Sequence, residues 1–287
     1  MRTIFSVVYL VVILLIASAC STAPKNPGDI YSLRKQAETQ LKLGNNEADR
    51  GGLKNALLIL DEAMRIAVAT DDPGLRIRVG LSRGNVLFSM ERGEEAAECW
   101  NNALAEAERS GNSELAAVCR IFIARGKLLS ADGKASAQSI RNEVEQNLAL
   151  CKSDRFHTAF AWMIIGLAEK ELGRYADAEA AIRRSLEIHE KDRYLELAAY
   201  DWFLIASFRS LAANYAGARQ ALEMAIGLDR RVENSWGLAS DWRAIGDVQI
   251  KAGDREKARF AYTRAADIFR SIGNEEAADE TLARINR

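Results

Sequence analysis

The chain has 287 residues, of which 48% are hydrophobic and 28% charged, with 39 basic and 40 acidic side chains. These shares are ordinary for a soluble helical protein. The near balance of charge argues against a nucleic acid or a strongly anionic membrane surface as partner, because neither would be attracted electrostatically.

The first 19 residues are typical of a secretory signal peptide. Arg2 supplies a positive end, residues 4–16 form a mostly apolar run, and residues 17–19 are small. The apolar run is shorter than the roughly 20 residues that a bilayer span needs. Cys20 follows directly, and this arrangement resembles a bacterial lipoprotein box.

That resemblance implies that Cys20 is lipidated, with palmitate among its acyl chains, and becomes the mature N-terminus. Ser21 rather than Asp follows it, which by the same resemblance favours the outer membrane and a periplasm-facing protein. The alternative is an ordinary cleavage site, after which Cys20 is only the first residue of a soluble secreted protein. Residues 20–29 are small, polar or proline and are expected to form a flexible tether of about 30 Å at most.

After the tether the pattern is almost entirely helical. The chain has three prolines, none of them beyond Pro73, so no proline interrupts the helices after that point. Helix breaks are predicted at residues 71–74, 110–112 and 271–274. Residues 275–285 are predicted to form one more helix with a charged side, as a terminal cap requires.

One motif recurs along the chain. Within residues 159–185, an aromatic Trp162 precedes the small residues Gly166 and Ala178, and Gly173 is placed to end the first helix. Small residues recur at the place of Gly166 in five other copies: Gly44, Gly84, Gly126, Ala206 and Gly246. This pattern resembles the tetratricopeptide repeat, in which small residues let two antiparallel helices approach.

The resemblance implies an all-α fold over residues 30–287, a right-handed α-solenoid of about six helix-turn-helix repeats with a C-terminal capping helix. The period, set by the equal spacing of Trp162, Trp202 and Trp242, is longer than the family's usual period of about 34 residues. Longer helices would explain the difference.

The third repeat fits the pattern less well. Gly126 and Gly133 match Gly166 and Gly173. However, Gln138 and Glu145 fall where small residues belong. A slip of one residue replaces them with Ala137 and Val144, so we expect the helix to follow the slipped register.

In this family the second, fifth, ninth and twelfth places of each first helix face a concave surface that binds a peptide or a helix. They are Phe160, Met163, Leu167 and Lys170; Tyr200, Phe203, Ser207 and Ser210; Ser240, Arg243, Asp247 and Ile250; and, in repeats two and three, Arg78, Asn85, Arg120 and Lys127. The resemblance implies a groove that is apolar at its centre and cationic toward the N-terminus. The alternative is that the aromatic residues are core.

No catalytic motif, metal site or cofactor site is recognised, so the chain is not expected to be an enzyme. His157 and His189 have no partner at metal spacing and are interpreted as structural. A bridge between Cys99 and Cys119 is conceivable, but free thiols that pack as small apolar residues, Cys151 included, are favoured.

The function expected from the resemblance is a lipid-anchored scaffold or adaptor of the cell envelope that binds other proteins or peptides. Three alternatives belong to other classes: a solute-binding subunit of a periplasmic transport system, an enzyme, and a self-associating structural element. An enclosed apolar pocket would favour the first, and clustered acid–base or metal ligands would favour the second.

Lipidation of Cys20 predicts that the mature protein fractionates with membranes. Cys20→Ala should release it as a soluble periplasmic protein or leave the signal peptide uncut. Mass spectrometry of the mature N-terminus decides the question, since an unmodified cysteine there would contradict the prediction.

Overall fold

The computed structural model describes residues 27–130, 132–151 and 154–286. The expected signal peptide and Cys20 lie outside these residues. The tether was expected to run to residue 29, but the first described helix already begins at Pro27, a position where the missing proline N–H costs nothing. None of the helices in the described part of the chain has the length and apolar character needed to cross a membrane.

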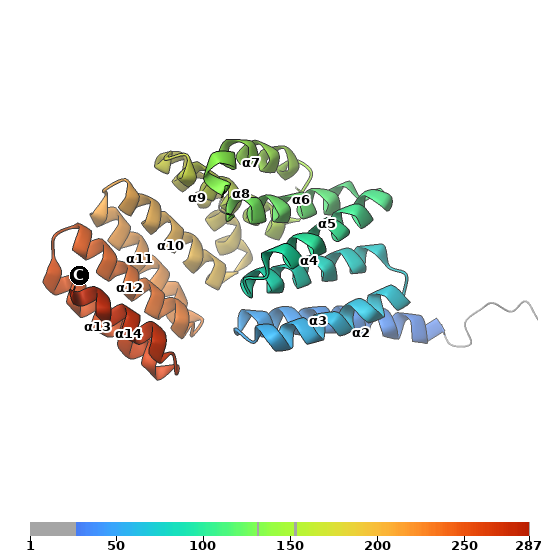
Figure 1. Cartoon of the computed structure of the whole chain (residues 1–287), viewed down its shortest axis with the longest axis horizontal. Coiled ribbons are helices and arrows are strands. Elements are labelled where there is room, and N and C mark those ends of the chain that lie inside the picture. The colour runs from blue at the N-terminus through green and yellow to red at the C-terminus, as the bar shows by residue number, and fades with distance from the viewer. Residues whose placement is uncertain (1–26, 131, 152–153, 287) are drawn as a thin grey trace, which may run out of the picture. The chain divides into compact units, whose positions relative to one another are not determined.

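The described residues are almost all helical and form two compact units, Met1–Met90 and Glu91–Arg287. The first unit contains α2 (Pro27–Asp49), α3 (Leu53–Ala69) and α4 (Pro73–Ser89). The second contains α5 (Gly93–Arg109), α6 (Ser113–Leu128), α7 (Gly133–Leu148), α8 (Arg155–Glu171), α9 (Tyr175–Asp192), α10 (Leu195–Leu211), α11 (Tyr215–Arg231), α12 (Ser235–Lys251), α13 (Arg255–Ser271), α14 (Glu275–Ala283) and the 3₁₀ turn η1 (Arg284–Asn286). Within each unit, every helix packs against the next one along the chain (Figure 1).

The connecting turns repeat a single geometry. Outside the two turns that flank α7, each has one residue at positive φ, and these residues are Gly51, Asp71, Glu91, Gly111, Gly173, Arg193, Ala213, Glu233, Gly253 and Gly273. In the turns around residues 173–273, the amide after the positive-φ residue donates to a carbonyl five residues earlier, as Asn234 does to Asp229 at 3.0 Å. This is the Schellman bond that closes a helix end.

The turns account for the long repeat. Most helices have 17 residues, and most connections between them have three. The positive-φ positions therefore recur at a constant interval, except between Gly111 and Gly173. The second helices are thus as long as the first, as the long period predicted. Gly173 does end a first helix, with φ of +75°.

Gly133 has a different role from the one predicted. It does not end the first helix of repeat three but begins α7. A Cβ there would collide with the carbonyl oxygen of Leu128 at the end of α6. Glycine is needed because the two helices meet at that point.

Small residues on the first helices create the close contacts that the motif predicted. A Cβ on Gly166 would lie 2.8 Å from Ile182 Cδ1 and 3.1 Å from the Ala178 carbonyl oxygen. In the same way Gly44 faces Leu60 and Gly246 faces Tyr262. The slip of one residue in repeat three is also confirmed, because Ala137 and Val144 are fully buried whereas Gln138 and Glu145 are exposed.

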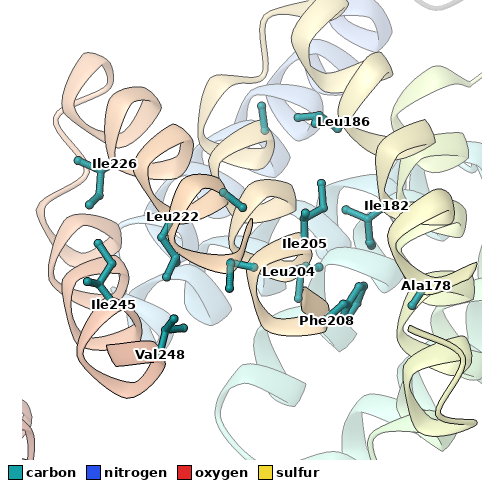
Figure 2. Packing of buried hydrophobic residues seen from close by; sticks show 14 of the residues in the cluster. Ala178, Ile182, Leu186, Leu204, Ile205, Phe208, Leu222, Ile226, Ile245 and Val248 are labelled. Carbon is teal, nitrogen blue, oxygen red and sulfur yellow. The ribbon is translucent and has the colours of Figure 1, made fainter. Parts of the chain in front are cut away.

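The core of the second unit is continuous across repeats. Ile182 and Leu186 of α9 meet Leu204, Ile205 and Phe208 of α10, and the cluster continues into α11 and α12 (Figure 2). Each helix thus buries side chains against both its neighbours. Such an array is stabilised by nearest-neighbour interfaces and has no single central core.

The tight contact at Ala178 gives a test of the register. Ala178→Leu adds three heavy atoms beside Gly166 and should lower the free energy of unfolding by about 1–3 kcal/mol. Ala180→Leu is the matched control, because Ala180 lies exposed on the same helix. Chemical denaturation of the two variants should separate them; equal stability would show that the register is wrong.

Candidate functional site

The first helices of repeats three to six are α6, α8, α10 and α12, and the surface that they form is called here the first-helix face. α6 contacts α8 directly, and α10 contacts α12. All predicted groove residues from Arg120 onward lie on these four helices. Arg78 and Asn85 lie on α4 in the other unit, where Arg78 is 3.9 Å from Glu38.

Four aromatic side chains on this face form what we call the aromatic strip: Phe122, Phe160, Tyr200 and Phe203. The rings of Phe122 and Phe160 stack with centroids 4.6 Å apart, and those of Tyr200 and Phe203 with centroids 6.3 Å apart. Tyr200 is 47% exposed, whereas Phe160 and Phe203 are half-buried. Tyr200 is therefore accessible on this face, whereas Phe160 and Phe203 are partly covered by neighbouring side chains.

The basic residues expected beside the strip are already engaged. Arg120 is 2.6 Å from Glu108, and Lys127 is 3.7 Å from Glu143. The basic side chain at the strip itself is Arg125, whose guanidinium carbon lies 6.0 Å from the centroid of Phe160. The groove prediction missed Arg125, although it lies three residues after Phe122, a spacing that puts both on one helix face.

Two of the remaining groove residues of repeat four face the interior. Met163 and Leu167 pack against the continuous core of the second unit, and so they support the strip more than they extend it. The third, Lys170, is half-buried, and its Nζ lies 2.8 Å from Glu171 Oε1.

Between the C-terminal halves of α10 and α12 lies a small pocket of about 170 Å³ that includes Phe203, Ser207, Ser210 and Asp247. Ser210 and Asp247 already have partners. Ser210 accepts a hydrogen bond from Lys251 Nζ at 3.2 Å, and Asp247 accepts from Tyr262 and Arg284. Ser210 and Ser240 were expected to be exposed in the groove but are buried, because the adjoining repeat packs over that side of each helix.

A second pocket, of about 230 Å³, lies between the N-terminal halves of α10 and α12, and we call it the acid pocket. Its lining comprises Glu196, Ala199, Tyr200, Phe203, Asp229, Asn234, Trp236, Gly237, Ser240, Asp241 and Arg243. The structure thus brings four predicted groove residues, Tyr200, Phe203, Ser240 and Arg243, around one cavity. Ile250 lies at the far end of α12 and is 38% exposed.

Two carboxyl groups meet in the acid pocket. Asp229 and Asp241 are 3% and 2% exposed, and each affects the pKa of the other. Burial is the main cause that raises the pKa of Asp241 to about 8, and the adjacent Asp229 is the second cause. Burial also raises the pKa of Asp229 to about 6. Near neutral pH the pair therefore holds one proton, as two carboxyls do when they share a site.

The corresponding place one repeat earlier holds a different pair. His189 and Asp201 lie one repeat period before Asp229 and Asp241, and His189 Nδ1 is 2.7 Å from Asp201 Oδ2. Ser185 completes this buried group through a 3.2 Å hydrogen bond to Asp201. Sequence reasoning missed both pairs, although aligning the repeats at their period places them in register.

The Ser185–His189–Asp201 group lacks the geometry of a hydrolytic triad. Ser185 Oγ lies 3.4 Å from the same Nδ1 that faces Asp201, whereas a triad places serine and aspartate on opposite ring nitrogens. Ser185 is fully buried, so no substrate reaches it. His157 is likewise structural, with Nδ1 2.6 Å from Asp154.

The other candidates for chemistry in the described part of the chain are metal ligands and thiols. Within the described residues, no group of three or more His, Cys, Asp or Glu is arranged to hold a metal ion. Cys119 and Cys151 are buried free thiols, and burial raises the pKa of Cys119 to about 12 and that of Cys151 to about 11. Neither forms appreciable thiolate at neutral pH, so neither is a nucleophile.

Comparison with known proteins agrees with the repeat pattern. Residues 161–192 match the family model of the tetratricopeptide repeat. These residues and the fold support a tetratricopeptide-repeat protein. No curated protein matches the sequence.

Solved structures share the fold at low identity. A Rap protein complexed with Competence and Sporulation Factor gives a TM-score of 0.63 at 14% identity, over 88% of this chain and 74% of that one. BtubC (BKLC) from P. vanneervenii gives 0.58 at 16% identity, over 83% and 92%. The Cut9–Hcn1 hetero-tetramer of APC/C gives 0.63 at 13% identity, over 91% of this chain and 46% of that one. The fold is the all-α solenoid that the sequence predicted.

The buried acid pair predicts an unusual dependence of stability on pH. The unfolded chain releases the proton of Asp241 near its ordinary pKa of 3.8, whereas the folded chain keeps it to about pH 8. The free energy of unfolding should therefore fall as the pH rises through this window, because the folded state binds more protons. Asp241→Asn should flatten that slope.

Urea denaturation at about pH 5 and about pH 8 measures the slope. Asp267→Asn, which removes an exposed carboxylate on α13, is the control and should leave it unchanged. A wild-type slope equal to that of Asp241→Asn would contradict the assignment.

Proposed function

We propose that this protein is a lipid-anchored scaffold or adaptor of the bacterial cell envelope, which binds segments of partner proteins on its first-helix face. The observation that carries the binding role is the aromatic strip, in which Tyr200 is 47% exposed at the acid pocket and Phe203 lines both pockets of that face. Aromatic side chains with a polar tip are enriched at protein interfaces. The strip therefore offers anchors that a partner can cover.

The shared fold supports the same role. The similarly folded Rap protein is complexed with Competence and Sporulation Factor, and Cut9 assembles with Hcn1. In this family the groove is also the binding surface. We therefore assign partner binding to the first-helix face rather than to the second helices.

The location in the envelope rests on the sequence alone. Cys20 follows a signal-peptide pattern, and α2 begins at Pro27. Six residues between a lipidated cysteine and the first helix would hold the helical part within about 20 Å of the membrane surface. On this proposal the protein faces the periplasm, on the outer membrane, and presents its first-helix face to envelope proteins.

The size of the two pockets on the first-helix face supports this role over a solute site on that face. Pockets for small-molecule ligands usually have volumes of about 300–1,000 Å³. The acid pocket has about 230 Å³ and the neighbouring pocket about 170 Å³. These volumes suit single side chains of a partner protein better than a transported solute.

A double substitution tests the binding face. Phe160→Ala with Tyr200→Ala removes one aromatic from each stacked pair and leaves Phe203, which packs on the core, in place. We expect partner capture by crosslinking in the native host to fall about tenfold or more, since aromatic hot spots contribute about 2 kcal/mol each.

Phe260→Ala is the matched control, because Phe260 is 61% exposed on the second helix α13 and off the first-helix face. It should leave capture unchanged. Circular dichroism should show the same helix content in all variants. Undiminished capture by the folded double variant would contradict the proposed face.

A further inference from the structure

We propose that the acid pocket binds an arginine side chain of the partner protein, with Asp229 and Asp241 receiving its guanidinium group. This inference rests on the proposed function and adds the chemistry of one contact. It is carried by unpartnered buried atoms, by the comparison of equivalent repeats and by the composition of the pocket walls.

The pocket contains polar atoms that lack partners. Among the described residues, neither Asp241 Oδ2 nor Ser240 Oγ has a hydrogen-bond partner. Both side chains line the cavity, and Ser240 is 9% exposed and Asp241 2%. Leaving such atoms unpaired is costly in a folded protein, so a ligand that donates hydrogen bonds there would recover the cost.

Comparison with the equivalent interface one repeat earlier shows that the acid pocket lacks a basic group. At the interface of α9 and α10, Asp201 faces His189, an internal donor that carries positive charge when protonated. At the interface of α11 and α12, the same two positions hold Asp229 and Asp241. The second interface therefore keeps the buried acceptor but replaces its basic partner with another acid, which leaves room for a cation from outside.

The walls of the pocket suit a guanidinium. Trp236 and Tyr200 are 57% and 47% exposed at the cavity, and Phe203 lies beside Tyr200. A planar guanidinium stacks on aromatic faces while its N–H groups bond to carboxylates, which a lysine ammonium does less well. A carboxylate pair below aromatic side chains is thus complementary to arginine in both shape and charge.

The charge of the lining is acidic. Glu196, Asp229 and Asp241 line the pocket together with one basic residue, Arg243. Arg243 is directed elsewhere: its guanidinium carbon lies 5.3 Å from the centroid of Phe269, and its charge interacts with Asp247, Glu280 and Arg284. It therefore does not fill the place in front of the acid pair.

Binding should depend on pH with a defined sign. A guanidinium favours the ionised pair, so binding should expel the proton that Asp229 and Asp241 share. Affinity should rise as the pH increases from about 6 to about 8, the range in which the pair loses its proton. Glu196 is the other acid near Asp229, and arginine itself stays charged throughout this range.

The probe is a capped pentapeptide, acetyl-Ala-Ala-Arg-Ala-Ala-amide, titrated into the full-length protein and followed by NMR at the Trp236 indole. The control peptide carries citrulline, which has nearly the shape of arginine without its charge. We expect the arginine peptide to bind at least about tenfold more tightly at pH 8, with the difference shrinking at pH 6. Equal binding of the two peptides would overturn the proposal.

Two variants assign the contact. Asp229→His recreates at this interface the pair found at His189 and Asp201, and it should abolish the preference for arginine while the fold is retained. Asp241→Asn should reduce affinity about tenfold and remove its pH dependence. Arginine binding that survives in both folded variants would exclude the acid pair as the site.

The test of the arginine site can fail independently of the test of the proposed function. Failure of the binding face would appear as undiminished partner capture after loss of Phe160 and Tyr200. Failure of this inference would appear in the purified protein as an absent preference for arginine over citrulline, whether or not partners are captured by the aromatic strip.

Discussion

The helix-ending turn with one residue at positive φ is the constraint on which the rest of this structure depends. It recurs at a constant interval over most of the chain and gives successive helices the same length and the same reversal of direction. Half of these positions are not glycine, including Arg193 and Glu233, although a left-handed conformation costs such residues roughly 1–2 kcal/mol. The Schellman bonds and the packing that follows each turn offset that cost.

The same turn creates the polar sites at the interfaces between repeats. Asp229 accepts the Schellman bond of its turn through its carbonyl, while its side chain accepts from Asn234 Nδ2 at 3.0 Å. Asn234 in turn caps α12 by accepting from the Gly237 amide. His189 occupies the same place in the equivalent turn one repeat earlier, and its carbonyl accepts from the Tyr194 amide. At these two interfaces the turn therefore holds a side chain from the last turn of a second helix against the N-terminal half of the next first helix.

These equivalent places differ in chemistry although their backbones match. One holds His189 with Asp201, the next Asp229 with Asp241, and the last has Phe269 and Thr281 at the corresponding positions, both fully buried. The first and last are satisfied within the protein, by a 2.7 Å contact between His189 Nδ1 and Asp201 Oδ2 and by apolar packing. The middle one keeps a buried acid pair that weakens the fold as pH rises, and buried groups of this kind are concentrated at functional sites.

The sequence by itself determined the helical class, the long repeat period and the closest contacts between helices. Periodicity alone sufficed for these, because Gly166, Ala178 and Ile182 are local signals whose spacing reflects one helix packing on the next. It also predicted that the groove residues from Arg120 to Ile250 lie on the first helices α6, α8, α10 and α12, since places on a regular helix follow from counting. It misplaced Gly133, because the turn between the two helices of repeat three differs in length. It also predicted that Ser210 and Ser240 are exposed, whereas the structure buries both.

Only the tertiary structure decided the chemistry of the face. Asp229 looks like an ordinary charged residue beside Arg230 and Arg231, and Asp241 lies on another helix. Their pKa values are raised only because the turn brings α11 onto α12 and removes water from both carboxyls. Burial is a property of the assembled repeats, and so the acid pocket could not be predicted from any one helix.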